Sequence, residues 1–145
     1  MRTKIVPIIC FAICSLYSSL NAGTLRQQLD KTFEFEKGGK LILRNTNGNI
    51  KLESWNRDEI KGEAEKIVKA KSLRRTEEIM KEVRIEIEHD IDYLEIQTHI
   101  PRYPNEFWDS IFRGGVSISV NYHLIVPNNL KLDISTVNGG IKILA

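Results

Sequence analysis

Two copies of one short unit constrain the fold of this chain more than any other feature. They span residues 43–52 (LRNTNGNIKL) and 134–143 (ISTVNGGIKI). In each copy an Asn-Gly pair separates two stretches in which apolar and polar residues alternate. Asn and Gly reach positive φ at low energetic cost, which a tight turn requires. The pairs Asn47-Gly48 and Asn138-Gly139 therefore predict structural turns between strands.

Two architectures accommodate such a unit. In the first, each copy is a β-hairpin within a sandwich. In the second, the Asn-Gly pair turns a corner between successive rungs of a stacked β structure, in which neighbouring units bury a common core. The sequence leaves both interpretations open.

The rest of the chain predicts more strands and one helix. Period-2 alternation of apolar residues predicts strands over residues 33–36, 40–45, 49–54, 59–70, 83–88, 94–98, 116–126 and 130–134, followed by the second Asn-Gly unit. Residues 83–98 form an antiparallel hairpin in this interpretation, and residues 23–31 are an irregular lead-in.

The expected helix covers residues 72–82, with Ser72 as its N-cap and Leu73, Thr76, Met80 and Val83 on its apolar face. The predicted fold is therefore all-β, with mostly antiparallel strands in a sandwich or a short solenoid-like stack, and one short helix.

The first 22 residues have the pattern of a secretory signal peptide. Arg2 and Lys4 precede an apolar stretch over residues 5–16, and a small-residue end leads to Ala22. The stretch is shorter than the roughly 20 residues of a membrane-spanning helix. Cys10 and Cys14 each follow Ile, so lipidation is not expected. We predict cleavage after Ala22, a single β-rich domain over residues 23–145, no membrane span after cleavage, and export to the periplasm, the cell surface or the medium.

Removal of this segment changes the composition in two ways. Both cysteines are lost, so neither disulfides nor thiolate metal sites are expected in the mature chain. Two of the 21 basic residues are also lost and none of the 19 acidic ones, which leaves 19 of each sign. A net charge near zero gives no indication of nucleic acid as a partner.

A family resemblance follows from the order of these features. The features that carry it span about residues 33–143. They are the Phe-x-Phe strand, the NGNIKL unit, Trp55 with NRDEI, the short helix, VNYHLIVP at 120–127 and TVNGGI at 136–141. This arrangement resembles the bacterial exported β-strand-repeat proteins named adhesins, a domain of unknown function. The resemblance implies a right-handed solenoid or sandwich-like stack at the cell envelope, with no catalytic residues to carry over. Family members continue through more rungs, and we expect this chain to be a short version.

No grouping of residues indicates catalysis. His89, His99 and His123 lack the spacing of a metal motif and read as exposed polar residues. Asp90 and Asp92 could ligate calcium, but a turn between two strands explains them equally well. Nucleophile motifs and a glycine-rich phosphate loop before a helix are absent from the sequence. We therefore expect no enzyme, no cofactor and no metal.

An aromatic loop over residues 101–115 is the candidate binding segment. Its aromatic and basic side chains are of the types enriched in binding hot spots and sugar platforms, although they also suit a loop that caps the core. The candidate residues are Tyr103, Phe107, Trp108, Phe112 and Arg113.

Three functions fit the sequence. The first is a non-catalytic envelope domain that binds or displays an unknown protein or glycan, with self-association through the C-terminal edge strand as one mode. The second is a periplasmic small-ligand or glycan-binding accessory protein that uses the aromatic loop. The third, an enzyme, requires His89 or His123 beside a carboxylate in a cleft.

Overall fold

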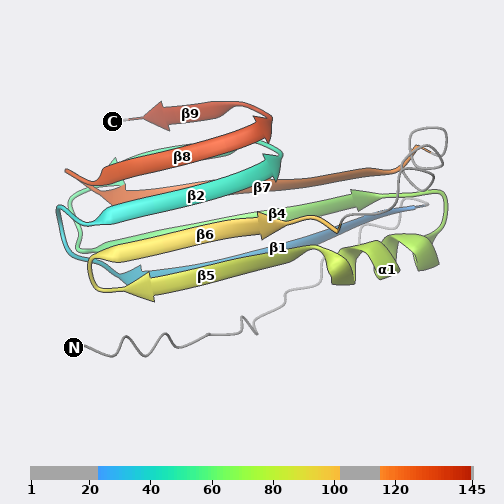
Figure 1. Ribbon diagram of the computed structural model, residues 1–145, viewed down its shortest axis with the longest axis horizontal. Helices are drawn as coiled ribbons and strands as arrows, with labels where there is room; N and C mark the ends of the chain where they lie inside the picture. The colour runs from blue at the N-terminus through green and yellow to red at the C-terminus, as the bar shows by residue number, and fades with distance from the viewer. Residues whose placement is uncertain (1–22, 102–114, 145) are drawn as a thin grey trace.

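The computed structural model describes residues 23–101 and 115–144. Nine strands and one helix follow one another along these residues (Figure 1): β1 Thr24–Glu34, β2 Lys40–Asn47, β3 Ile50–Trp55, β4 Glu59–Lys69, α1 Leu73–Glu82, β5 Arg84–Asp90, β6 Tyr93–His99, β7 Ser117–Pro127, β8 Lys131–Asn138 and β9 Ile141–Leu144. The predicted all-β class with a single short helix is confirmed.

The strands form two sheets that face each other. One sheet has the order β1-β4-β7-β3-β9, and the other has the order β5-β6-β2-β8. The predicted hairpin of β5 and β6 is present and antiparallel. The expectation of mostly antiparallel strands needs correction, because four of the seven pairings are parallel and the sheets are mixed.

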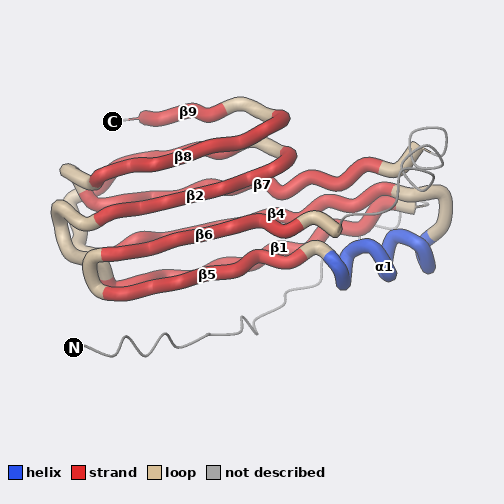
Figure 2. The backbone as a smooth tube through the Cα atoms, viewed as in Figure 1, coloured by secondary structure: helices blue, strands red, loops and turns tan. Residues whose placement is uncertain are grey.

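The parallel pairings arise because the Asn-Gly units are corners and not hairpins. β2 lies in one sheet and β3 in the other, and β8 and β9 repeat this arrangement. We call each such pair of strands with its corner a rung. Lys40 pairs with Lys131 and Ile50 with Ile141, so the two rungs stack in register at a constant offset of 91 residues. Figure 2 shows the two corners one above the other.

A third rung, formed by β6 and β7, lies on the other side of β2 and β3. Six positions separate Arg44 from Ile50, whereas twenty-five separate their partners Gln97 and Tyr122. Between these paired positions the β6–β7 rung therefore has 19 more residues than the β2–β3 rung. The insertion includes most of the aromatic loop.

The N-terminal lead-in is the second correction. Thr24–Glu34 is an eleven-residue strand that pairs antiparallel with all of β4. Leu25 and Leu29 pack against the core. Gln27 and Lys31 interrupt the apolar alternation on the same face, which is why the pattern was not visible in the sequence.

The helix forms as predicted, and the Ser72 hydroxyl accepts a hydrogen bond from the Arg75 backbone amide. Thr76, Ile79 and Met80 are buried, whereas Leu73 is exposed, contrary to the expected apolar face. Among the described residues no helix has the length and apolar character to cross a membrane.

The core lies between the sheets and consists of inward-facing residues from successive rungs. The β2–β3 rung contributes Leu41, Leu43, Ile50 and Leu52, all essentially buried. Burial of aliphatic side chains at about 1.5–3 kcal/mol each is the main stabilising term in such a stack.

Candidate functional site

The corners of the rungs require glycine because the rungs approach each other closely there. Gly48 and Gly139 have φ of 122° and 156°. A Cβ atom on Gly48 would lie 2.2 Å from the Val120 carbonyl oxygen, and one on Gly139 would lie 2.0 Å from the Gly48 carbonyl oxygen. A side chain at Gly48 or Gly139 would push the rungs apart, so both glycines are needed for this close approach.

Asparagine side chains connect the corners of adjacent rungs. The Asn121 Oδ1 atom accepts a hydrogen bond from the Asn49 backbone amide at 2.9 Å, and the Asn49 Oδ1 atom accepts one from the Gly140 amide at 2.8 Å. Gly140 occupies the next position of this column and has no side chain. The column of asparagine acceptors therefore stops at the β8–β9 rung.

Other polar corner side chains donate back to the preceding rung. Asn45 Nδ2 donates to the Val120 carbonyl at 2.8 Å, and Asn47 Nδ2 donates to the Ile118 carbonyl at 2.6 Å. On the last rung, Thr136 Oγ1 donates to the Gly48 carbonyl at 3.2 Å. The last rung is thus held by the same kind of contact as the rung before it.

A cross-rung ion pair also holds β8 against β2. The Arg44 guanidinium forms a two-point contact with the Asp133 carboxylate, and Nη1 lies 2.6 Å from Oδ1. Such planar two-point pairing stabilises the contact and also fixes the relative orientation of the two side chains. The contact lowers the pKa of Asp133, because the Arg44 hydrogen bond favours the charged carboxylate.

The inward side of the last rung is open, and this is its distinguishing feature. Ile141 is 43% exposed, whereas its partner Ile50 on the preceding rung is 1% exposed. Ile143 is 58% exposed and Leu132 is 40% exposed, although both occupy inward positions whose counterparts are buried. We call the inward side chains Leu132, Ile134, Ile141 and Ile143, with the outer edges of β8 and β9, the open rung.

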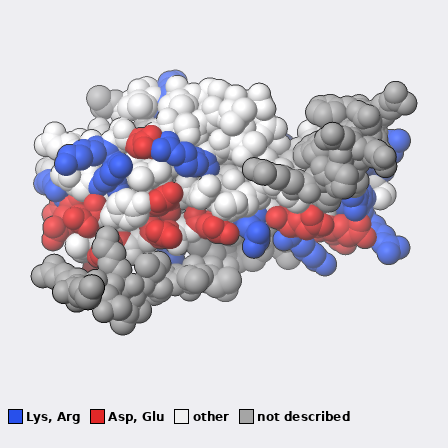
Figure 3. Space-filling view, in the orientation of Figure 1, with Lys and Arg blue, Asp and Glu red and all other residues white. Residues whose placement is uncertain are grey.

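The open rung borders a hollow, and its outer strand edges lie at the margins of the two described sheets. β8 and β9 are the last strands of their sheets, so one edge of each pairs with no described strand. A cavity of about 560 Å³ lies between them, lined partly by Leu52, Val126, Leu130, Leu132 and Ile143. Figure 3 shows few charged side chains over this part of the molecule. An aliphatic surface beside two unpaired edges is suited to binding another β structure.

The predicted binding residues of the aromatic loop lie outside the described residues. Tyr103, Phe107, Trp108, Phe112 and Arg113 all belong to the undescribed segment 102–114. Glycan or ligand binding by this loop stays a prediction.

The three histidines do not come together. His89 Nε2 lies 2.9 Å from the Glu34 carbonyl oxygen, and His99 Nε2 lies 2.9 Å from Glu86. His123 lies between Glu53 and Glu63, with one ring nitrogen 3.5 Å from each carboxylate. The neighbours of His123 in β7, Tyr122 and Leu124, are buried, so His123 is on the outward face of its sheet.

The carboxylates beside His123 are also paired with lysines. The pKa of Glu53 is lowered mainly by its hydrogen bond with Lys51, and that of Glu63 mainly by Lys61. Two lysine–glutamate pairs, Lys51 with Glu53 and Lys61 with Glu63, thus lie on either side of His123. The enzyme hypothesis required a carboxylate beside His123 in a cleft; the two carboxylates that lie there are on an outward sheet face and are paired with lysines.

The turn between β5 and β6 accounts for the two aspartates considered for calcium. The Asp90 side chain accepts a hydrogen bond from the Ile91 backbone amide, and the Asp92 backbone carbonyl accepts one from the Lys40 amide. Within residues 23–101 and 115–144, His, Cys, Asp and Glu side chains form no group of three or more that could hold a metal ion.

The chain was compared with protein-family models, with curated proteins and with solved structures, and no match was found. The resemblance to the exported adhesin-type repeat proteins therefore stays a prediction from the sequence.

Sequence reasoning identified Ile141 and the terminal edge but not the full extent of the open rung. Leu132 and Ile134 have the same alternation as Leu41 and Leu43, and only the order of strands in the sheets distinguishes an inner rung from an outer one. Whether a strand lies at a sheet edge depends on which other strands pair with it, and the residues of the strand itself do not show this.

Proposed function

We propose that this protein is a non-catalytic, exported β domain of the cell envelope whose open rung binds the open rung of a second copy. The observation that carries the proposal is the contrast between Ile141, 43% exposed, and Ile50, 1% exposed, at equivalent positions. Aliphatic side chains that face the core direction and remain in water favour a partner that covers them.

Two open rungs suit each other because a twofold axis pairs identical strand edges antiparallel. Each edge supplies the backbone donors and acceptors that the other lacks, and the aliphatic side chains form a common core. The opposite end of the stack has inward polar side chains, Gln27 and Lys31, on its edge strand. Inward charges oppose strand addition, so we expect a closed dimer and not a head-to-tail filament.

The envelope location rests on the predicted signal peptide and on the family resemblance. If the interpretation is correct, protein recovered from the exported fraction begins at Gly23, which intact mass measurement detects. A product that retains residues 1–22 would contradict the predicted cleavage.

The function is tested by size-exclusion chromatography with light scattering on residues 23–145. We expect a dimer for the unmodified protein and a monomer for Ile141→Lys, because a buried unpaired ammonium opposes pairing. Val137→Lys is the matched control, because Val137 is on the same rung, is 76% exposed and points away from the hollow between the sheets. This variant should remain dimeric.

A monomer at every concentration would overturn the proposal. A polymer that Ile141→Lys disperses would overturn the closed twofold pairing. If Val137→Lys dissociates the dimer as completely as Ile141→Lys, the outward face of β8 also belongs to the interface, and the assignment of the interface to the open rung is overturned.

A further inference from the structure

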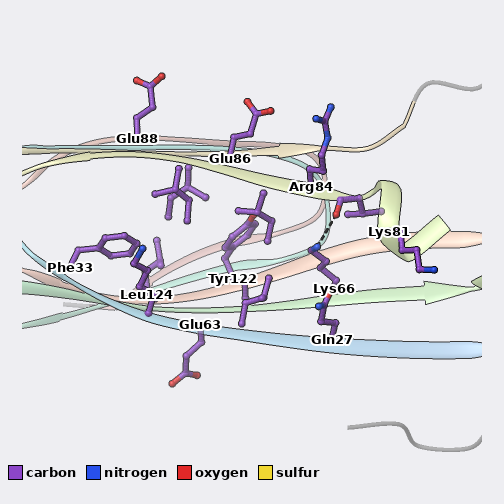
Figure 4. A pocket seen from close by; sticks show the side chains of 18 residues that line it. Gln27, Phe33, Glu63, Lys66, Lys81, Arg84, Glu86, Glu88, Tyr122 and Leu124 are labelled. Carbon is purple, nitrogen blue, oxygen red and sulfur yellow. Dashed lines mark hydrogen bonds between the residues drawn. The ribbon is translucent and has the colours of Figure 1, made fainter. Parts of the chain in front are cut away.

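A second hollow lies at the opposite end of the stack, between the edge strands β1 and β5. Its volume is about 590 Å³, within the range of about 300–1,000 Å³ that is typical of small-molecule sites. Figure 4 shows side chains from both sheets that project into it. We call this hollow the slot.

Two contacts between the sheets mark the ends of the slot. Near the helix, Lys66 Nζ on β4 donates to the Val83 carbonyl at 2.8 Å. Near the β5–β6 turn, His89 Nε2 lies 2.9 Å from the Glu34 carbonyl oxygen, and the His89 and Phe33 rings are 5.0 Å apart. The slot is the interval between these points, so it is elongated along the strands.

The interior of the slot is largely aliphatic and aromatic. Leu29, Ile85 and Ile87 are partly buried there, and Phe33 and Leu124 form the deeper wall. The hollow exists because β4 has only small residues at its centre: Gly62 and Ala64 occupy inward positions where neighbouring strands have large side chains. An apolar lining of this kind suits a chain of methylene groups.

Two lysines face inward in this apolar setting. Lys31 on β1 and Lys66 on β4 both line the slot, and Lys31 Nζ lies 5.2 Å from the Phe33 ring centroid. Burial lowers the pKa of Lys31. The carboxylates of Glu63, Glu86 and Glu88 border the slot but point away from it (Figure 4). Lys66 thus points inward, whereas the three carboxylates, like Arg84 and Lys81, point outward (Figure 4).

We propose that the slot binds a single-chain aliphatic carboxylate, with its hydrocarbon chain between β1, β4 and β5 and its carboxylate beside Lys31. Charge complementarity selects the head group, and the length and apolar lining of the slot select the chain. The inference does not use the open rung and goes beyond the proposed dimer.

The competing explanation is that Lys31 only protects an edge strand, since inward charges serve this purpose in many sheets. The two explanations differ in what they predict about ligands. A protective lysine needs no bound anion, whereas a head-group lysine must discriminate between an acid and its neutral ester.

The test is fluorescence titration with cis-parinaric acid, a long-chain polyene acid that emits in apolar surroundings, and with its methyl ester. We expect the acid to bind about tenfold more tightly than the ester, which is the size of one charge-assisted contact. Lys31→Met should remove this preference. Lys69→Met is the matched control, because Lys69 is an exposed lysine on β4 outside the slot, and it should retain the preference.

Ala64→Leu should prevent binding of both probes because it fills the slot. Leu29→Gln serves the same purpose without added volume, and circular dichroism shows whether each variant folds. Equal binding of acid and ester to the unmodified protein, or an unchanged preference in Lys31→Met, would overturn the proposal. Ile141→Lys should bind the acid as the unmodified protein does, which separates this result from the test of the dimer.

Discussion

At one end of the stack the edge strand β1 directs Gln27 and Lys31 between the sheets, whereas at the other end β8 and β9 direct Leu132, Ile134, Ile141 and Ile143 there. Among the described strands, each end has edges without a pairing partner, and each end has a hollow of similar volume. Inward charge opposes the addition of another strand, and an aliphatic row favours it. The difference teaches that similar hollows at the two ends suit different occupants: a small amphiphile beside Lys31 and another β surface at the open rung.

The largest effect is expected from one substitution made at equivalent positions of two rungs. Ile50→Ala should destabilise the protein by about 2–5 kcal/mol, because Ile50 is buried and its loss leaves a cavity. Ile141→Ala should cost well under half of that in dilute monomer and should weaken the dimer. Urea unfolding at two protein concentrations measures both quantities. Equal and concentration-independent losses would show that the open rung is already covered within one chain.

The next effect concerns the two corner glycines. Gly48→Ala should cost about 1–3 kcal/mol from backbone strain alone, and displacement of the Val120 carbonyl adds to it. In Gly139→Ala the new Cβ atom would collide with the Gly48 carbonyl oxygen, but the outer rung can move away from the β2–β3 rung. We expect Gly139→Ala to have the smaller effect on global unfolding and to reduce hydrogen-exchange protection mainly in β8 and β9. Loss of protection throughout the stack would contradict this local opening.

The sequence predicts the strands well where one face is regularly apolar. Alternation over 116–126 gives β7, and the Ser72 cap gives the start of α1. The apolar alternation does not predict β1, because Gln27 and Lys31 interrupt the row of inward-facing apolar residues at the slot. It also leaves the Asn-Gly units ambiguous, because a hairpin and a corner both require positive φ, and only long-range pairing decides between them.

The open rung and the slot are harder to predict from the sequence than the strands are. The sequences around Ile50 and Ile141 are nearly the same, yet one isoleucine is buried and the other is exposed. Their difference comes from which strand lies next in each sheet. The slot likewise depends on the position of Gly62 and Ala64 opposite β5, which the residue pattern of β4 does not reveal.

A third prediction compares a side-chain hydrogen bond near the slot with one at the open rung. Tyr122, which borders the slot, has its hydroxyl 2.7 Å from the Thr98 hydroxyl in the core. Tyr122→Phe should cost about 1 kcal/mol, because Thr98 loses its partner. Thr136→Val removes the longer, partly exposed bond to Gly48 and should cost less. Thermal unfolding of both variants measures the difference, and a larger loss for Thr136→Val would contradict the expected order.

Tyr122 also gives a dependence on alkaline pH. Burial raises the pKa of Tyr122 to about 12 from its ordinary value of 10.0. A group whose pKa is raised on folding contributes stability that is complete below the unfolded pKa and is lost as pH rises through the folded pKa. Stability should therefore fall between about pH 10 and 12, and Tyr122→Phe should show a shallower decline. Identical slopes in the two proteins would exclude this contribution.

The smallest effect is expected at the ion pair between Arg44 and Asp133, because both side chains are partly exposed and solvent screens them. Arg44 lowers the pKa of the Asp133 carboxyl below 3.8. The stabilising contribution is therefore complete above pH 3.8 and is lost as pH falls through the folded pKa. Asp133→Asn should lower the unfolding temperature slightly near neutral pH, and the difference from the unmodified protein should vanish in acid.

Arg44→Gln is the matched partner of that variant. It removes the same contact from the β2 side, so the double variant should show little loss beyond either single variant. Additive losses would mean that the two side chains act independently. In that case the last rung is held against β2 by its backbone pairing and its corner, and the open rung is positioned without help from this ion pair.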